Sequence, residues 1–144
     1  AIVEATQGGI EFFHGYTYSG HPLASAAILA TLDLYRRDGL FERARSLAAL
    51  FEDAAHSLRT APHVIDVRNL GLVAGIELAP RNGAPGARAT EAFQRCFERG
   101  LLVRVTGDVI ALAPPLIVEA DQIAWMFETL REVLGEIDAS AGRA

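Results

Sequence analysis

The hydrophobic rhythm of this chain changes at Ala61-Pro62, and the change constrains the fold more than any other feature. Before it, apolar residues recur every three or four positions, which is typical of amphipathic helices. After it, β-branched residues gather in "HVIDVRNLGLVAGIELA", residues 63–79, a pattern that favours strands. The sequence therefore predicts an α+β fold, with a helical part followed by a part that contains a sheet.

Two helices are expected before the change. The first begins near Pro22, because a proline at the first helical position loses no hydrogen bond there. It ends at Asp38-Gly39, where glycine can adopt the left-handed conformation that terminates helices. The second covers about residues 40–59 and carries a single apolar stripe. Together they are expected to form a long helical arm over residues 22–59.

Residues 60–138 are expected to form a small domain. The run at 63–79 reads as two short strands or as one long bent strand, interrupted around Asn69–Gly71. The elements expected after that run are a helix at about 87–99, a hairpin within 101–115 turned on Thr106-Gly107-Asp108, and a helix at about 119–137. The predicted order is β-α-β-β-α, with helices packed on a mainly antiparallel sheet, and residues 139–144 are expected to fray.

Composition argues against several classes of function. The chain has 144 residues, of which 51% are hydrophobic and 22% charged, as expected for one globular domain. A net charge of −5 argues against a nucleic-acid partner. No apolar run approaches the ~20 residues that span a bilayer, so no membrane partner is expected. One cysteine, Cys96, and four histidines without ligand spacing predict no metal site and a reducing, cytoplasmic setting.

All basic residues of the chain are arginine. Because there is no lysine, no side chain can form a Schiff base, and the only amine is the α-amine of Ala1. The chain opens without Met and without a capping signal or turn ahead of "AIVEATQGG". We therefore expect it to be the later part of a longer protein.

The segment "EFFHGYTYSGHP", residues 11–22, concentrates aromatic, hydroxyl and glycine residues just before the first helix. The first backbone amides of a helix are unsatisfied and carry partial positive charge. Thr17 and Ser19 precede these amides, so a hydroxyl and N–H groups could bind a phosphate without lysine. The alternative is that Thr17 or Ser19 only caps the helix while the aromatic rings pack beneath it.

Arg104 is the second candidate, because it interrupts the apolar run "LLVRVTGDVIALAPP". If the strand is largely buried, the guanidinium needs a partner, and its planar fork suits a carboxylate. The alternatives are an internal ion pair with Asp108 or Glu77, or an alternation that leaves Arg104 on the solvent face. Asp108 and Asn69 are expected to shape turns, and Cys96, Trp125 and Met126 lie at helical spacings expected of core residues.

These segments resemble one family. "EFFHGYTYSGHPLASAAILATLDLYRRDGLFERA" is similar to the stretch after the active-site lysine of class III, fold-type I pyridoxal-phosphate aminotransferases. "HVIDVRNLGLVAGIELAPRNGAPGARA" and "ERGLLVRVTGDVIALAPPLIVEADQI" resemble the C-terminal domain of the ω-amino acid (β-alanine):pyruvate branch. The resemblance covers about residues 8–135.

The resemblance implies a role for each candidate. It implies that Thr17, with Tyr16 beside it, contributes to binding the phosphate of a cofactor held mainly by the partner subunit of a homodimer or tetramer. It implies that Arg104 pairs with the carboxylate of pyruvate or alanine and swings aside for amines without one. Residues 1–21 would be the tail of the cofactor domain.

The same resemblance implies that essential parts lie upstream. The Schiff-base lysine, the aspartate at the pyridine nitrogen and the aromatic residue on the ring are all absent, so the chain contains no catalytic residue and should be inactive alone, binding no cofactor by itself. We expect the C-terminal portion of an enzyme whose substrates are an amine and a 2-oxo acid. The alternative is a stand-alone, non-catalytic α+β module that binds a ligand or partner.

Overall fold

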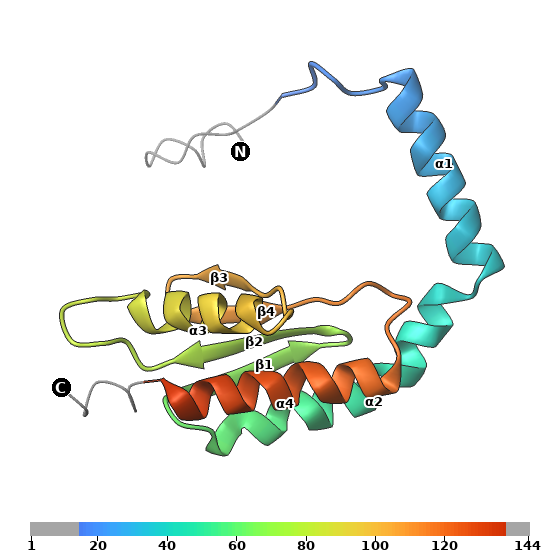
Figure 1. Ribbon diagram of the computed structural model, residues 1–144. Helices are drawn as coiled ribbons and strands as arrows, with labels where there is room; N and C mark the ends of the chain where they lie inside the picture. The colour runs from blue at the N-terminus through green and yellow to red at the C-terminus, as the bar shows by residue number, and fades with distance from the viewer. Residues whose placement is uncertain (1–14, 138–144) are drawn as a thin grey trace, which may run out of the picture. The chain divides into compact units, whose positions relative to one another are not determined.

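The computed structural model describes residues 15–137 and shows four α-helices and a four-stranded antiparallel sheet in that range (Figure 1). The chain divides into two compact units, residues 1–38 and residues 39–144. The predicted α+β class is confirmed. The domain boundaries proposed at residues 21, 59 and 138 stay predictions.

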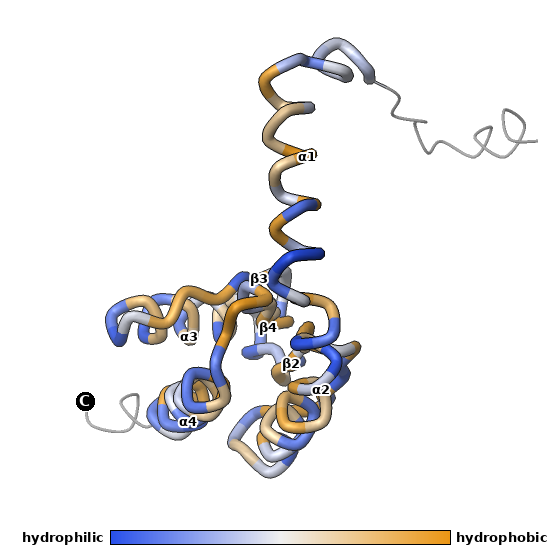
Figure 2. Tube along the Cα trace, turned by 90° about the vertical axis from the view of Figure 1, so that its right-hand side faces the viewer, coloured by the Kyte–Doolittle hydropathy of each residue, from blue (hydrophilic) through white to orange (hydrophobic). Residues whose placement is uncertain are grey.

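The described part of the first unit is dominated by helix α1, Pro22–Arg37. Its bounds are those predicted, with Pro22 in the first turn and Asp38 at the C-terminus, followed by Gly39 at φ +59°. No residue of α1 is buried, although most of the helix is hydrophobic (Figure 2). Its exposed large apolar side chains are Leu23, Ile28, Leu29, Leu32 and Leu34.

The second unit contains three α-helices. These are α2, Leu40–His56, α3, Ala87–Glu98, and α4, Ala120–Glu136. Helix α2 was predicted to continue to about residue 59, but its last turn tightens into the 3₁₀ helix η2, Ser57–Thr60. Helix α4 begins with a capping box, in which the Glu119 backbone N–H donates to the side-chain oxygen of Gln122 at 2.9 Å.

The sheet is built from two hairpins. Its strands are β1, Val64–Leu70, β2, Val73–Leu78, β3, Arg104–Thr106, and β4, Val109–Leu112, in the spatial order β1-β2-β4-β3. The run at 63–79 is therefore two strands joined by a tight turn, rather than one bent strand, and Gly71 supplies the positive φ of +55° that the turn needs. The second hairpin turns at Gly107-Asp108, as predicted.

The helices pack on one face of the sheet. Helix α2 contacts β1 and β2, helix α3 contacts β3 and β4, and α4 packs against both helices. Helices α2 and α4 run side by side (Figures 1 and 2), and the rings of Phe51 and Phe127 meet edge to face at 5.1 Å between centroids. Alternate strand residues supply the sheet's share of the core: Val67, Ala74, Ile76, Leu78, Ile110 and Leu112.

Two of the three expected core residues are buried. Cys96 is fully buried, and burial raises the pKa of its thiol to about 11, so it is an inert core residue. Met126 is also buried, but Trp125 is 46% exposed, and the expectation is wrong there.

Within residues 15–137, no helix combines the length and the apolar run that crossing a bilayer requires.

A ladder of ion pairs joins α3 to α4. Glu91 accepts from Arg81 and from Arg95, which lies 2.8 Å away. Arg99 contacts Glu136 at 2.5 Å and Glu132 at 3.3 Å. The hydrogen bond from Arg99 lowers the pKa of the Glu136 carboxyl below its ordinary value of 4.5, and Arg81 does the same for Glu91. The native state therefore favours the ionised form of both carboxyls.

We predict that Glu136→Gln weakens the acid sensitivity of folding. A carboxyl whose pKa is lower in the folded state stabilises the fold above its unfolded pKa, and this stabilisation is lost as pH falls through the folded value. The unfolding midpoint in urea, measured at pH 7 and at about pH 3, should therefore fall less in E136Q than in the parent. Glu98→Gln, an exposed change on α3, is the control, and an unchanged acid response in E136Q would contradict the assignment.

Candidate functional site

The turn before α1 holds Thr17 at the surface. The Ser19 backbone N–H donates to the Tyr16 carbonyl at 2.9 Å, and the His21 N–H donates to the Tyr18 carbonyl at 3.3 Å. Two successive turns thus lead into α1, and Gly20 supplies a φ of +75°. Tyr16 is 66% exposed and Thr17 is exposed as well.

This helix start is not closed by a side chain. The N-cap residue is His21, no side-chain hydrogen bond caps the helix, and its first turn contains no acidic residue. Neither Thr17 nor Ser19 therefore caps α1, and the structure does not have the alternative in which one of them only caps the helix. Tyr18 is exposed rather than packed beneath the helix, and Phe12, Phe13 and His14 lie outside the described residues. A hydroxyl beside uncapped amides of positive partial charge fits an anion such as a phosphate.

Arg104 is the first residue of β3, an edge strand of the sheet. Arg104 is exposed, because the side chains of the strand alternate between the two faces of the sheet. Val103 is buried and Val105 is half-buried toward the helices, so Arg104 comes to the opposite, exposed face. The sequence analysis included this arrangement as the alternation that leaves Arg104 on the solvent face.

The two internal partners considered for Arg104 are engaged elsewhere. The Glu77 carboxylate accepts from Arg68 at 2.8 Å, and the Asp108 carboxylate accepts from the Gly86 backbone N–H at 2.8 Å. Within residues 15–137 no carboxylate forms an ion pair with Arg104. Its guanidinium is therefore available to an external carboxylate.

A mainly apolar hollow of about 590 Å³ lies beside Arg104. The other residues that line it are Phe93, Leu102, Val103, Val105, Ala111 and Ala113. One cation at the rim of an apolar hollow suits a small molecule with a carboxylate and a hydrocarbon part.

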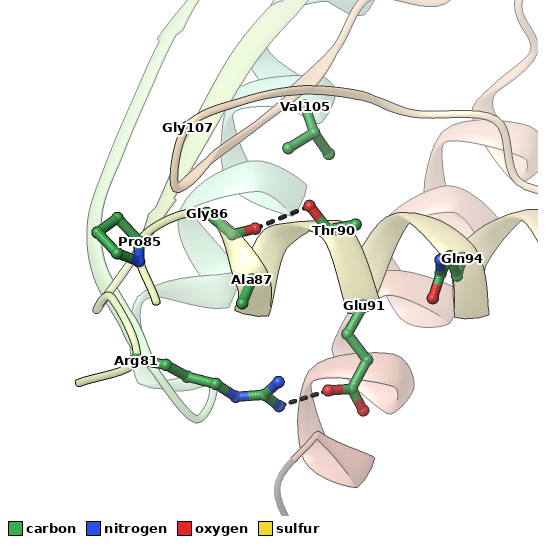
Figure 3. A pocket seen from close by; sticks show the side chains of 9 residues that line it. All are labelled: Arg81, Pro85, Gly86, Ala87, Thr90, Glu91, Gln94, Val105 and Gly107. Carbon is green, nitrogen blue, oxygen red and sulfur yellow. Dashed lines mark hydrogen bonds and ion pairs between the residues drawn. The ribbon is translucent and has the colours of Figure 1, made fainter. Parts of the chain in front are cut away.

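A second hollow, of about 810 Å³, lies at the N-terminus of α3 (Figure 3). Arg81 and Glu91 point toward each other there and form an ion pair. Gly86 has a φ of +77°, and a Cβ at this position would come within 3.4 Å of the Gly107 carbonyl oxygen. Because Arg81 and Glu91 neutralise each other and the Asp108 carboxylate accepts from the N–H of Gly86, the N-cap residue, this region joins the β3–β4 turn to the start of α3.

Of the two polar residues expected to shape turns, Asp108 lies in the β3–β4 turn, but Asn69 lies within strand β1, and the expectation is wrong there. Asp108 joins the β3–β4 turn to Gly86, as described, and its own carbonyl accepts from the Leu78 N–H at 2.9 Å. Asn69 forms a 2.8 Å hydrogen bond with the Nε2 of His56 and so ties β1 to the end of α2. Neither belongs to the hollow beside Arg104.

Residues 1–134 match the sequence profile of the family described as "Aminotransferase class-III". An omega-aminotransferase of Caulobacter vibrioides is 63% identical over 138 residues, which are 96% of this chain and 31% of that protein. A beta-alanine–pyruvate aminotransferase of Pseudomonas aeruginosa is 41% identical over 128 residues, 89% of this chain and 29% of that protein.

Solved structures agree with these relatives. A transaminase solved with L-alanine is 32% identical, with a TM-score of 0.80, and the match covers 97% of this chain and 34% of that one. An omega transaminase of Pseudomonas jessenii in complex with PMP is 30% identical, with a TM-score of 0.76, over 94% of this chain and 31% of that one. The chain belongs to the class III aminotransferase family, and it spans about a third of the length of the relatives it matches.

Sequence reasoning selected Thr17, Tyr16 and Arg104 but missed the surroundings of Arg104. Arg68 and Gly75 lie in the same row of the sheet as Arg104, on the face opposite to α2, α3 and α4. The signal for Arg68 was present, since it also interrupts a β-branched run. The strand register that brings the two arginines into one row could not be read from either run alone.

Proposed function

We propose that this chain is the C-terminal part of a pyridoxal-phosphate-dependent aminotransferase. The whole enzyme transfers an amino group from an ω-amino acid such as β-alanine, or from an amine, to pyruvate and so produces alanine. The observation that carries the proposal is an exposed arginine with no described carboxylate partner, beside an apolar hollow, in a chain of this family. The names of the relatives support this substrate class.

Arg104 binds the substrate carboxylate in this proposal. The guanidinium presents two parallel N–H donors, which match the two oxygens of pyruvate or alanine. The apolar lining of the hollow suits the short hydrocarbon part of these molecules and limits competition from water. An amine without a carboxylate offers no such acceptor, so Arg104 has to leave the site when that substrate binds.

Thr17 and Tyr16 bind the cofactor phosphate in this proposal. Pyridoxal phosphate, when bound, supplies the carbonyl that accepts the amino group and the electron sink that assists proton transfer. Thr17 donates its hydroxyl to the phosphate, and the uncapped amides at the start of α1 add to the positive potential. The phosphate belongs to the cofactor held mainly by the partner subunit of a homodimer or tetramer.

The chain alone is expected to be inactive. Holding the cofactor covalently and moving the substrate proton require a lysine amine, and the chain contains none. Helix α1, with five large exposed apolar side chains, is suited to packing against the cofactor domain of the whole enzyme. A stand-alone binding module, the alternative, would have a polar or covered helix here, so this exposure favours the aminotransferase.

The first prediction of this proposal concerns the native gene product. Its intact mass should exceed that of this 15.5 kDa chain, and borohydride should fix one pyridoxal-phosphate adduct on it, with loss of the cofactor's visible absorbance. Mass spectrometry before and after reduction measures both. A native product that is this lysine-free chain without an adduct would exclude catalysis and favour the binding module.

We predict that Arg104→Ala in the full-length enzyme reduces kcat/KM for pyruvate by about 10- to 150-fold, since hydrogen bonds to charged groups contribute about 1.5–3 kcal/mol. The half-reaction with a carboxylate-free amine should change much less, because Arg104 makes no contact with that substrate. Stopped-flow measurement of both half-reactions tests the difference. Arg45→Ala, which removes an exposed arginine from α2, is the matched control, and equal losses for both substrates would disprove the assignment.

We predict that Thr17→Ala in the full-length enzyme weakens retention of pyridoxal phosphate by roughly tenfold, the loss of one charge-assisted hydrogen bond. Equilibrium dialysis of the cofactor gives the dissociation constant. Ser19→Ala, on the same turn, is the control and should retain the cofactor as the parent does. Unchanged retention in T17A would remove Thr17 from the phosphate site.

A further inference from the structure

One row of the sheet carries an arginine at each end. The strand register places Arg68 opposite Gly75, Gly75 opposite Ala111, and Ala111 opposite Arg104. The row therefore contains one residue from each strand, on the face opposite to α2, α3 and α4. The two residues between the arginines are the smallest possible, so no bulky side chain of the row separates them.

Arg68 extends along this face toward β2. Its Nη1 contacts the carboxylates of Asp66 at 2.7 Å and Glu77 at 2.8 Å. These hydrogen bonds, the one from Glu77 first, raise the pKa of the Arg68 guanidinium above its ordinary value. Two carboxylates thus share one guanidinium, and the cluster carries a net charge of −1.

Glu77 can serve more than one cation. Its side chain is 38% exposed, and it lies on β2, which is nearer to β3 than β1 is. Asp66 lies on β1, at the far edge of the sheet. If Glu77 turned away, Arg68 would keep Asp66 as its partner and remain neutralised.

Arg104 lies within reach of Glu77. The two residues are two strands apart across the sheet and two residues apart along it, so their Cα atoms are separated by about 12 Å. An extended arginine and an extended glutamate together span a separation of that order. The path crosses β4 between Ala111, which pairs with Arg104, and Val109, which pairs with Glu77. Hollows lie on both sides of Ala111, one lined by Arg104 and the other by Arg68 and Val109.

We propose that Glu77 is the alternative partner of Arg104 and holds its guanidinium when the substrate has no carboxylate. The surplus negative charge of the Asp66–Arg68–Glu77 cluster then balances Arg104 outside the substrate site. Glu77 is in this way a positioning residue, because it acts on the substrate only through Arg104. It tunes the preference between amino acids and plain amines, and the inference rests on the role of Arg104 proposed above.

The test compares two substrates in the full-length enzyme. Glu77→Gln removes the alternative partner, so Arg104 remains in the substrate site as an uncompensated cation. We expect kcat/KM for a carboxylate-free aralkyl amine to fall about three- to fivefold, the size of a solvent-accessible ion pair. The value for alanine should stay the same or rise. A merely structural role of Glu77 would instead lower both values together.

Two further variants make the outcome decisive. Glu52→Gln, which neutralises an exposed glutamate on α2, should leave the ratio of the two kcat/KM values unchanged. In an Arg104→Ala background, Glu77→Gln should no longer affect that ratio. If E77Q leaves the ratio unchanged while R104A selectively impairs pyruvate, this inference fails and the role of Arg104 stands. If R104A impairs both substrates equally, the proposed function fails first.

Discussion

The alternation of side chains along the strands is the constraint on which the second unit depends. Every second residue of β2 and β4 is apolar and buried against the helices, with Ile76, Leu78 and Ile110 fully enclosed. Each such side chain contributes about 1.5–3 kcal/mol relative to an exposed one. A slip of one residue would expose this set and bury charged residues instead, so the register is strongly specified. The same alternation places Arg104 on the face opposite to α2, α3 and α4.

The residues on the face opposite to α2, α3 and α4 are therefore determined by which residues form the core. Once the apolar set faces the helices, the intervening residues have to lie together on the other side. On β1 and β2 these include Asp66, Arg68 and Glu77, whose charges could not be accommodated beneath the helices without a high cost of desolvation. A surface of alternating charge with two small residues at its centre results, and it is on this surface that Arg104 can meet a carboxylate.

Local signals predicted the helices well. Pro22, Gly39 and Gly100 mark helix ends by their own backbone preferences, and these do not depend on the remaining structure. The sheet was less determined, because 63–79 read either as two strands or as one bent strand interrupted around Asn69–Gly71, and only the pairing of its two halves shows that it turns. The position of Arg104 was left open by the sequence for a related reason. An apolar run does not reveal which strand lies at an edge, and an edge strand can leave a charge in water.

The candidate residues also divide the chemistry in a consistent way. Thr17 and Arg104 are both suited to binding anions at fixed positions, one through a hydroxyl beside uncapped amides and one through a planar guanidinium. The chain contains no lysine that could hold the cofactor covalently. In the function proposed above, this chain contributes the orientation of the bound anions and the discrimination between substrates, rather than the covalent step. It would influence the reaction through the substrate that it admits, and the charge balance around Arg104 would set that preference.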